Sequence, residues 1–427
     1  MSEYARYPEY KDSGVPWLGE IPSHWQSKRL KFLGEIVLGL TYSPEDITTD
    51  TENSTLILRS SNVQNGKLAF DDNVFVTKDI PKKMITTGND ILICSRNGSR
   101  ALIGKCALIE GHALNQAFGA FMTVYRSPYR KFIYYMLNSE IFKSQLGTFL
   151  TSTINQLTTQ VLGNFEISLP PDDEQKAINS FLDRELGKID ALIDKQQLLL
   201  DKLAEQRSAV ITQAVTKGLN PNAEMKDSGV AWLGDVPSHW QNKRLKFSIG
   251  NISEKVDAQT SDLRYFGLEN IQSFTGKIIS DVELTSEGVG NAFQKGDVLF
   301  GKLRPYLAKV YLAEENGLSS TEALVFRANK EILPQFLKYY CLSPDFISAV
   351  NGTTFGSKMP RASWEDISSF RIVYPPVDEQ IQIVEFIDQE TQKIDQMTET
   401  VNRTIERLKE YRSTLITQAV TGKIKVF

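Results

Sequence analysis

The sequence predicts an α+β protein built by tandem duplication, in which a mixed α/β globular domain followed by a long helix occurs twice. The two long helices are expected to pair as an antiparallel coiled coil. Three features predict this arrangement: a long proline-free stretch with a helical apolar period, its return 205 residues later, and a motif that opens both globular parts. The expected boundaries are residues 1–170 and 218–375 for the globular domains, and 171–217 and 376–427 for the helices.

The first long helix is predicted over Asp173–Thr216, between Pro170-Pro171 and Lys217-Gly218. A proline pair stops the preceding chain, and a cation followed by glycine suits a helix end. About 44 residues at roughly 1.5 Å each make a rod of about 65 Å, longer than one compact domain requires. Its apolar residues follow a 4-3-4-3 spacing: Ile178, Leu182, Ile189, Leu192, Leu199, Leu203 and Val210.

The second long helix repeats the first after Pro375-Pro376, and its apolar residues are Ile383, Ile387, Ile394, Met397, Val401, Leu408 and Leu415. The ends also match, because Ile211–Val215 and Ile416–Val420 both read ITQAV. A long helix with one apolar stripe must pair, and its own copy is the obvious partner. Beyond Val210 and Leu415 we expect no strong contact between the helices.

The globular parts open with the same motif and then diverge. Lys11–Phe32, KDSGVPWLGEIPSHWQSKRLKF, returns as Lys226–Phe247, KDSGVAWLGDVPSHWQNKRLKF. Short strands broken by turn residues and one helix are predicted in each part. In the first, the strands are Thr55–Leu58, Val74–Thr77, Ile91–Cys94, Ala107–Ile109, Phe118–Tyr125 and Phe165–Leu169, and the helix is Tyr129–Leu146. In the second, the strands are Leu263–Leu268, Asp297–Phe300, Val310–Leu312, Leu324–Arg327 and Phe370–Tyr374, and the helix is Leu333–Val350. We align the two helices through Tyr134-Tyr135 and Tyr339-Tyr340.

Two polar loops differ between the copies and carry the candidate DNA-binding residues. Ser95–Arg100 corresponds to Gly301–Tyr306, and Thr151–Gln156 corresponds to Gly356–Arg361. Arginine pairs bidentately with guanine in the major groove and asparagine with adenine, so these loops are candidate base readers. The candidates are Arg96, Asn97, Arg100, Thr153, Asn155 and Gln156 in the first domain, and Lys302, Arg304, Tyr306, Lys358 and Arg361 in the second.

Two short basic runs are candidates for phosphate contacts, which position a protein on DNA without reading its sequence. Their residues are Lys28, Arg29, Lys243 and Arg244. A solvated strand edge explains these runs equally well.

The composition is that of a globular protein: of 427 residues, 41% are hydrophobic and 23% are charged. No run of about eighteen apolar residues and no signal peptide is evident, and the three cysteines have no metal-ligand spacing, so we expect a cytoplasmic protein. The net charge of −4 argues against a protein that coats nucleic acid by charge alone.

No catalytic or metal-binding motif is found. Gly98–Lys105 resembles a phosphate loop, but its glycine spacing is wrong and Cys106 stands where a hydroxyl should bind magnesium. The acidic residues after Pro171 have the letters of a nuclease site, yet they begin a helix, where they complement the helix dipole. The repeat-equivalent His24 and His239 are favoured as packing or capping groups. No enzyme site therefore rises above background, and no metal site is predicted.

These paired motifs resemble the DNA specificity subunit of type I restriction–modification systems. The resemblance rests on the KDSGV-WLG-PSHW-KRLKF openings, the PP-DEQ helix starts at Pro170 and Pro375, and the ITQAV helix ends at Ile211 and Ile416. It covers nearly the whole chain. It implies two target-recognition domains, each reading one half of a split DNA site, held apart by two long antiparallel helices.

The resemblance also implies partners that perform the chemistry. Two adenine-N6 DNA methyltransferase subunits are expected to dock, followed by ATP-driven restriction and translocase subunits. S-adenosylmethionine, ATP and magnesium would belong to those partners, and the chain itself is expected to bind no cofactor. The target loops vary in this family, so the individual base contacts rest on side-chain chemistry alone.

Two other classes of protein stay open at this point. A regulatory DNA-binding protein acting alone is disfavoured by the net negative charge and by the lack of a helix-turn-helix motif. A coiled-coil scaffold without nucleic acid is the other, and sequence-blind, salt-insensitive behaviour would indicate it.

Overall fold

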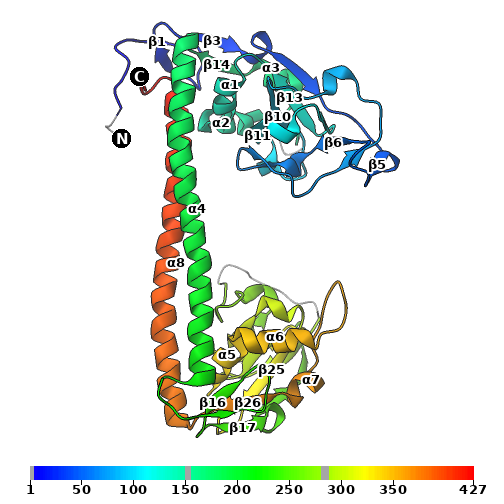
Figure 1. Cartoon of the computed structure of the whole chain (residues 1–427), viewed down its shortest axis with the longest axis vertical. Coiled ribbons are helices and arrows are strands. Elements are labelled where there is room, and N and C mark those ends of the chain that lie inside the picture. Colours follow the sequence, from blue (N-terminus) through cyan, green and yellow to red (C-terminus); the bar gives the residue numbers. More distant parts are fainter. Residues whose placement is uncertain (1–3, 150–154, 280–287) are drawn as a thin grey trace. The chain divides into compact units, whose positions relative to one another are not determined.

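The computed structural model describes residues 4–149, 155–279 and 288–427 of the chain. It divides into two compact units, of which the first comprises Met1–Gln196 with Arg403–Phe427 and the second Gln197–Asn402. Each unit holds one globular domain together with parts of both long helices, α4 and α8 (Figure 1).

The long helices agree with the sequence prediction to within a residue or two, except that the second, expected over 376–427, ends at Val420. Helix α4 spans Asp172–Lys217 and α8 spans Val377–Val420. At each start a glutamine side chain caps the proline pair: Gln175 Nε2 donates to the Pro170 carbonyl at 2.8 Å, and Gln380 Nε2 to the Pro375 carbonyl at 2.9 Å. Gly218 and Gly422 follow the two helices with φ of 73° and 69°, the left-handed conformation that glycine adopts without strain.

In its described residues, the first globular domain contains two four-stranded sheets and three two-stranded pairs. The order β11-β10-β13-β4 joins Cys106–Leu108, Asp90–Cys94, Met122–Arg126 and Glu35–Leu38. The order β12-β6-β9-β5 joins Ala117–Phe118, Thr55–Leu58, Phe75–Val76 and Ile47–Thr48. The pairs are β1 (Tyr10–Asp12) with β2 (Glu20–Pro22), β3 (Gln26–Arg29) with β14 (Glu166–Leu169), and β7 (Val63–Gln64) with β8 (Lys67–Leu68).

The second globular domain repeats the first sheet and rearranges the second one. The order β23-β22-β25-β18 joins Val310–Leu312, Val298–Gly301, Ala323–Ala328 and Ile249–Ile252. The order β19-β21-β24-β20 joins Lys255–Asp257, Val289–Phe293, Gly317–Ser319 and Tyr265–Phe266. The pairs are β15 (Met225–Asp227) with β16 (Asp235–Pro237) and β17 (Gln241–Arg244) with β26 (Arg371–Tyr374). In the described part of each domain, the second sheet contains a parallel pair, β6 with β12 and β20 with β24. In the first domain the sheet continues from β6, which pairs with β9, whereas in the second domain it continues from β24, which pairs with β21.

The strand predicted over Phe118–Tyr125 is wrong as a single element, because the chain turns at Gly119–Phe121 between β12 and β13. A Cβ placed on Gly39 would lie 2.1 Å from the Gly119 carbonyl oxygen, so two backbones meet closely there. The turn sends β12 into one sheet and β13 into the other.

The helix predicted in each globular domain is also wrong as a single element, because two helices occupy its place. They are α1 (Arg130–Leu137) and α2 (Glu140–Phe149) in the first domain, and α5 (Pro334–Leu342) and α6 (Pro344–Gly352) in the second. Pro344 lacks a backbone N–H and ends α5. Shorter helices α3 (Thr159–Asn164) and α7 (Trp364–Ser369) precede the last strands.

The alignment of the tyrosine pairs is wrong by one residue. Tyr135 Oη bonds Asp183 of α4, and the residue that makes the matching bond to Asp388 of α8 is Tyr339. Ser139 and Ser343 agree with this register, since each donates to a carbonyl three residues earlier, at 2.6 Å and 2.7 Å. Helices α1 and α5 therefore correspond with an offset of 204 residues.

The helix ends beyond Val210 and Leu415, where no strong contact between the helices is expected, are buried by the globular domains. Ala214 and Val215 are fully buried in the second unit, and Ala419 and Val420 in the first. Each helix end packs into the hydrophobic core of a globular domain. Predicted stripe residues Leu192, Leu199 and Met397 are instead 46%, 43% and 54% exposed.

Residues near the two ends of the described chain lie together in the first unit. Ala5 pairs with Lys425, and Tyr10 Oη donates to the Gly422 carbonyl at 2.9 Å. In the second unit the equivalent place, after Gly218, is crossed by continuous chain. In the second unit α4 therefore continues covalently into the globular domain, whereas in the first unit the end of α8 is joined to the start of the globular domain by hydrogen bonds.

Candidate nucleic-acid interface

A cavity of about 1140 Å³ lies between the helices and the β-loop at Gln272–Lys277 in the second unit, but the candidate base readers line two other cavities. In the first domain, a cavity of about 590 Å³ contains Arg96 and Asn97. The N–H groups of Ser95 and Arg96 both donate to the Phe121 carbonyl at 3.0 Å, so the segment after β10 is fixed against the turn before β13. This places the loop at the edge of the sheet.

The side chain of Arg96 is exposed and stacks on the ring of Phe121. Its guanidinium carbon lies 5.2 Å from the centroid of the Phe121 ring, and Phe121 is 58% exposed. An exposed arginine held over an aromatic face keeps its planar donors available while its orientation is restricted. Asn97 is more engaged, because its Nδ2 donates to Ser60 Oγ at 3.0 Å and its Oδ1 accepts from Ser99 N at 2.9 Å.

The described candidates Arg100, Asn155 and Gln156 do not line this cavity. The backbones of Gln156 and Arg96 form an antiparallel β-bridge. Asn155, the residue before Gln156, is exposed. Arg100 donates to the Gly147 carbonyl of α2 at 2.8 Å, which indicates a structural role for part of its guanidinium. Thr153 lies outside the described residues.

A smaller cavity of about 350 Å³ occupies the corresponding place in the second domain and is lined by Lys302 and Arg361. Backbone contacts match those of the first domain: Ala362 N donates to the Lys302 carbonyl at 3.0 Å, as Leu157 N donates to Ser95 at 2.8 Å. The guanidinium of Arg361 is bound to the Glu322 carboxylate, with Nε at 3.0 Å from Oε2 and Nη2 at 3.2 Å from Oε1.

Three further candidates of the second domain project from the neighbouring loops. Arg304 has a φ of 51°, and its N–H donates to the Pro360 carbonyl at 2.8 Å. Its Nη2 lies 3.4 Å from the carbonyl oxygen of Lys358, whose side chain is exposed. Tyr306 is 45% exposed. A left-handed arginine is strained, and strain of this kind clusters at binding sites.

The two cavities differ in their unpaired polar atoms, which the sequence did not reveal. Among the described residues, buried side-chain atoms without a hydrogen-bond partner include Arg59 Nε and Ser61 Oγ in the first cavity. In the second cavity they are Asn251 Oδ1 and Asn291 Oδ1. Arg59 Nε can only donate and the two asparagine oxygens can only accept, whereas the Ser61 hydroxyl can do either. Each such atom needs a partner from solvent or ligand, because an unpaired buried polar group is costly.

The basic runs lie elsewhere, beside the starts of the long helices. Arg29 Nε is 2.9 Å from Glu166 of the paired strand, and Lys243 Nζ is 2.7 Å from Glu331. Lys28 and Arg244 are exposed. Arg29 and Lys243 thus stabilise their own domain, which leaves Lys28 and Arg244 as the better candidates for phosphate contacts.

A glutamate in the first turn of each long helix contacts the tryptophan and the histidine of the opening motif. Glu174 accepts from Trp25 Nε1 at 2.8 Å and contacts His24 Nε2 at 2.6 Å. In the repeat, Glu379 contacts Trp240 Nε1 at 3.0 Å and His239 Nε2 at 2.7 Å. The histidines therefore have the packing role favoured from the sequence.

Lys105 is likewise structural rather than phosphate-binding. Its Nζ donates to the carbonyls of Ser60 at 2.6 Å and Val63 at 2.9 Å, and burial lowers its pKa. Lys309 makes the equivalent pair of bonds in the second domain. Within residues 4–149, 155–279 and 288–427 there is no group of three or more His, Cys, Asp or Glu side chains that could hold a metal ion.

The comparison with known families decides what these two domains belong to. Residues 22–199 and 238–407 match the family described as the type I restriction modification DNA specificity domain. The chain belongs to this family. It is a DNA specificity subunit of the type I restriction–modification class, the non-catalytic component of such systems.

Individual relatives agree with this assignment. The specificity subunit is 25% identical over 432 residues to the EcoKI specificity subunit of Escherichia coli K12, covering 95% of this chain and 90% of the relative. It is 23% identical over 315 residues to the Escherichia coli EcoDI specificity subunit, covering 69% and 70%. A solved structure from work on assembly and conformational transition of the type I R-M system has a TM-score of 0.62 at 16% identity, covering 94% of this chain and 98% of that chain, and shares the fold.

No described helix of the specificity subunit is long and apolar enough to cross a membrane.

Proposed function

We propose that the specificity subunit reads a split, asymmetric DNA site, with residues 1–170 reading one half and residues 218–375 the other. The observation that carries this proposal is the contrast between the two cavities. One is lined by Arg96, which stacks on Phe121, and the other by Lys302 and by Arg361, which is bound to Glu322. Base edges are distinguished by their donor and acceptor patterns, so unlike cavities suit unlike half-sites.

The long helices would pair as an antiparallel coiled coil that sets the distance between the half-sites. Within the first unit, Arg412 of α8 lies 3.0 Å from Asp190 of α4, and within the second, Arg207 of α4 is bound to Asp395 of α8. In each unit an arginine of one long helix meets an aspartate of the other, with the helices exchanged between the units. We expect the two readers to address half-sites in opposite directions along the duplex.

Two adenine-N6 methyltransferase subunits would dock on surfaces that both repeats share. One such surface contains Phe32 in the first domain and Phe247 in the second, which are 71% and 66% exposed. A lysine lies over each ring, Lys31 and Lys246, at 5.3 Å from the centroid in both cases. An exposed aromatic side chain retained in both copies, while the target loops diverge, suits one kind of partner bound twice.

The chemistry would belong to the partners. S-adenosylmethionine would bind the methyltransferase subunits, and ATP and magnesium the restriction and translocase subunits, in a cytoplasmic complex. The chain's own contribution is the choice of sequence.

Mapping of methylated adenines tests this proposal. A strain that lacks other adenine methyltransferases is given this chain with its methyltransferase partner, and modified positions are mapped across the genome. We expect one motif with two unlike half-sites about one helical turn apart. A continuous palindrome, or methylation without sequence preference, would contradict the proposal.

The docking surface is tested separately. Replacing Phe32 and Phe247 by serine should weaken co-purification of the methyltransferase while the recognised sequence stays the same. Replacing the comparably exposed Phe121 by serine is the matched control, because it lies in the first cavity. It should change the first half-site and leave co-purification intact.

A further inference from the structure

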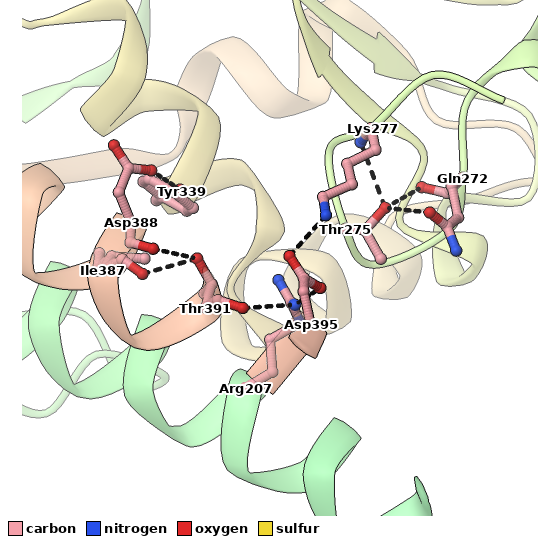
Figure 2. Close-up of polar contacts among 9 residues, drawn as sticks. All are labelled: Arg207, Gln272, Thr275, Lys277, Tyr339, Ile387, Asp388, Thr391 and Asp395. Atoms are coloured by element: carbon pink, nitrogen blue, oxygen red, sulfur yellow. Dashed lines mark hydrogen bonds and ion pairs between the residues drawn. The ribbon is translucent and has the colours of Figure 1, made fainter. Parts of the chain in front are cut away.

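Each unit contains a Lys–Asp–Arg triad that ties its globular domain to both long helices. In the second unit, Asp395 of α8 accepts from Lys277 Nζ at 2.6 Å and is also bound by Arg207 of α4 (Figure 2). Arg207 is only 8% exposed and donates to the Thr391 carbonyl at 3.2 Å. The carboxylate is therefore held in place by a buried arginine, and the lysine of the globular domain meets a fixed partner.

The first unit repeats the triad with the helices exchanged. Asp190 of α4 lies 2.8 Å from Lys67 Nζ and 3.0 Å from Arg412 Nε of α8. Burial alone would raise the pKa of Asp190, but the bond from Lys67 and the charge of Arg412 outweigh it and lower the pKa. The aspartate therefore stays ionised.

The loops that deliver the lysines are unlike, although the lysines meet equivalent partners. Lys67 follows the short turn Asn65-Gly66 between β7 and β8. Lys277 follows a turn that is two residues longer, between the paired Ile271 and Ile278, compared with Val63 and Leu68 in the first domain. A lysine retained on loops of different length indicates a function for the contact itself.

A second contact lies one heptad away on the same helix. Tyr135 bonds Asp183, seven residues before Asp190, and Tyr339 bonds Asp388, seven residues before Asp395. Seven residues span about 10 Å along a helix. The start of each long helix also packs into the globular core, through residues such as Ile178 and Ile383. The lysine contact therefore adds a hold on the domain farther along the helix than this packing and the tyrosine.

We propose that the lysine contacts are struts that fix the tilt of each target-recognition domain on the helices, so that Lys67 and Lys277 help to select the spacer length. This inference rests on the proposed reading of a split site. The lysines are positioning residues, since they act on the half-site through the orientation of the domain. Without the strut, a domain still held by its core packing and its tyrosine should read the same bases at a less strictly defined distance.

The expected effect is moderate, because the lysine side chains are 66% and 54% exposed. Exposed ion pairs of this kind change a population by at most about fivefold. The two struts lie in separate units, so their effects should multiply in a double variant.

The test compares methylation rates on DNA with the native spacer and with spacers one base pair longer and shorter. The complex carries Lys67→Met, Lys277→Met or both, with Lys277→Arg as the conservative variant. Lys295→Met, at an exposed lysine in the β21–β22 turn, is the control. We expect the preference for the native spacer to fall up to about fivefold for each strut lost and to be restored by arginine, with half-sites unchanged. An unchanged preference in the double variant would overturn the inference.

A measurement without DNA separates this inference from the proposed function. Spin labels on Glu365→Cys and Gln396→Cys report the distance between the second globular domain and α8, because Cys94, Cys106 and Cys341 are buried. Lys277→Met should broaden the distribution of this distance, and Lys277→Arg should not. An unchanged width would refute the strut. If the wild-type complex methylates no split site, the proposed function fails whatever the width shows.

Discussion

Lengthening both helices at their middle should lengthen the DNA spacer. Four residues inserted after Gln196 in α4 and four after Asn402 in α8 add about 6 Å and rotate the following chain by about 40°. Insertions of four residues are tolerated in coiled coils as local unwinding. The middle is the right place, because Leu198 and Leu199 are 57% and 43% exposed, whereas Val215 near the helix end is fully buried.

The expected change is one to two base pairs. One base pair of DNA adds 3.4 Å and turns the half-site by about 35°, which agrees best with a rotation of about 40°. Methylation mapping of the variant should therefore give both original half-sites with a spacer longer by one base pair, or by two if the domains follow the helices fully. Thermal unfolding of the variant serves as the control for stability.

A two-residue insertion at the same positions is the matched contrast. It adds only about 3 Å but rotates the following chain by about 200°, so a domain would face away from the DNA. Methylation should be lost although the protein remains folded. An active four-residue variant with an unchanged spacer would refute the idea that helix length sets the spacing.

Further predictions concern single side chains. Arg96→Ala should relax only the first half-site and Arg304→Ala only the second, each by about 1–3 kcal/mol in methylation assays on mismatched sites; equal loss in both halves would indicate a structural role. Arg126→Met should lower the free energy of unfolding by about 3–5 kcal/mol in denaturant titrations, since Asp90 is fully buried and would lose its ion pair at 2.7 Å; a change below 1 kcal/mol would exclude this. Because the pKa of Asp190 is lowered in the folded state, its stabilisation is present above pH 4 or so and is lost as the pH falls further. Asp190→Asn should therefore flatten the fall in the free energy of unfolding below about pH 4, and an equally steep fall would contradict this.

The sequence predicted the repeated parts well, because repetition gives two readings of each signal. The long helices, the opening motif and the strands Thr55–Leu58 and Val310–Leu312 agree with the structure. The helix-start acids were understood as capping groups, but their bonds to Trp25 and Trp240 could not be foreseen. Those bonds join residues about 150 positions apart, and periodicity carries no information about such distances.

The errors arose where tertiary contacts override a local pattern. Phe118–Tyr125 has continuous strand-forming residues, yet the close approach of Gly39 and Gly119 bends it into two elements. The alignment through paired tyrosines failed because both members of each pair look alike in sequence, and only their bonds to Asp183 and Asp388 distinguish them. The cavity residues Asn251, Asn291, Arg59 and Ser61 come from separate segments, so no motif brought them together.

Grafting the first globular domain onto both positions tests the central claim most directly. Residues 245–370 are replaced by residues 30–165, whose ends close in the same way: Leu30 N donates to the Phe165 carbonyl at 3.0 Å, and Leu245 N to the Phe370 carbonyl at 2.7 Å. If each domain reads one half-site on an approximately two-fold scaffold, methylation mapping should give the first half-site followed by its reverse complement. A motif that keeps the second half-site would contradict the account.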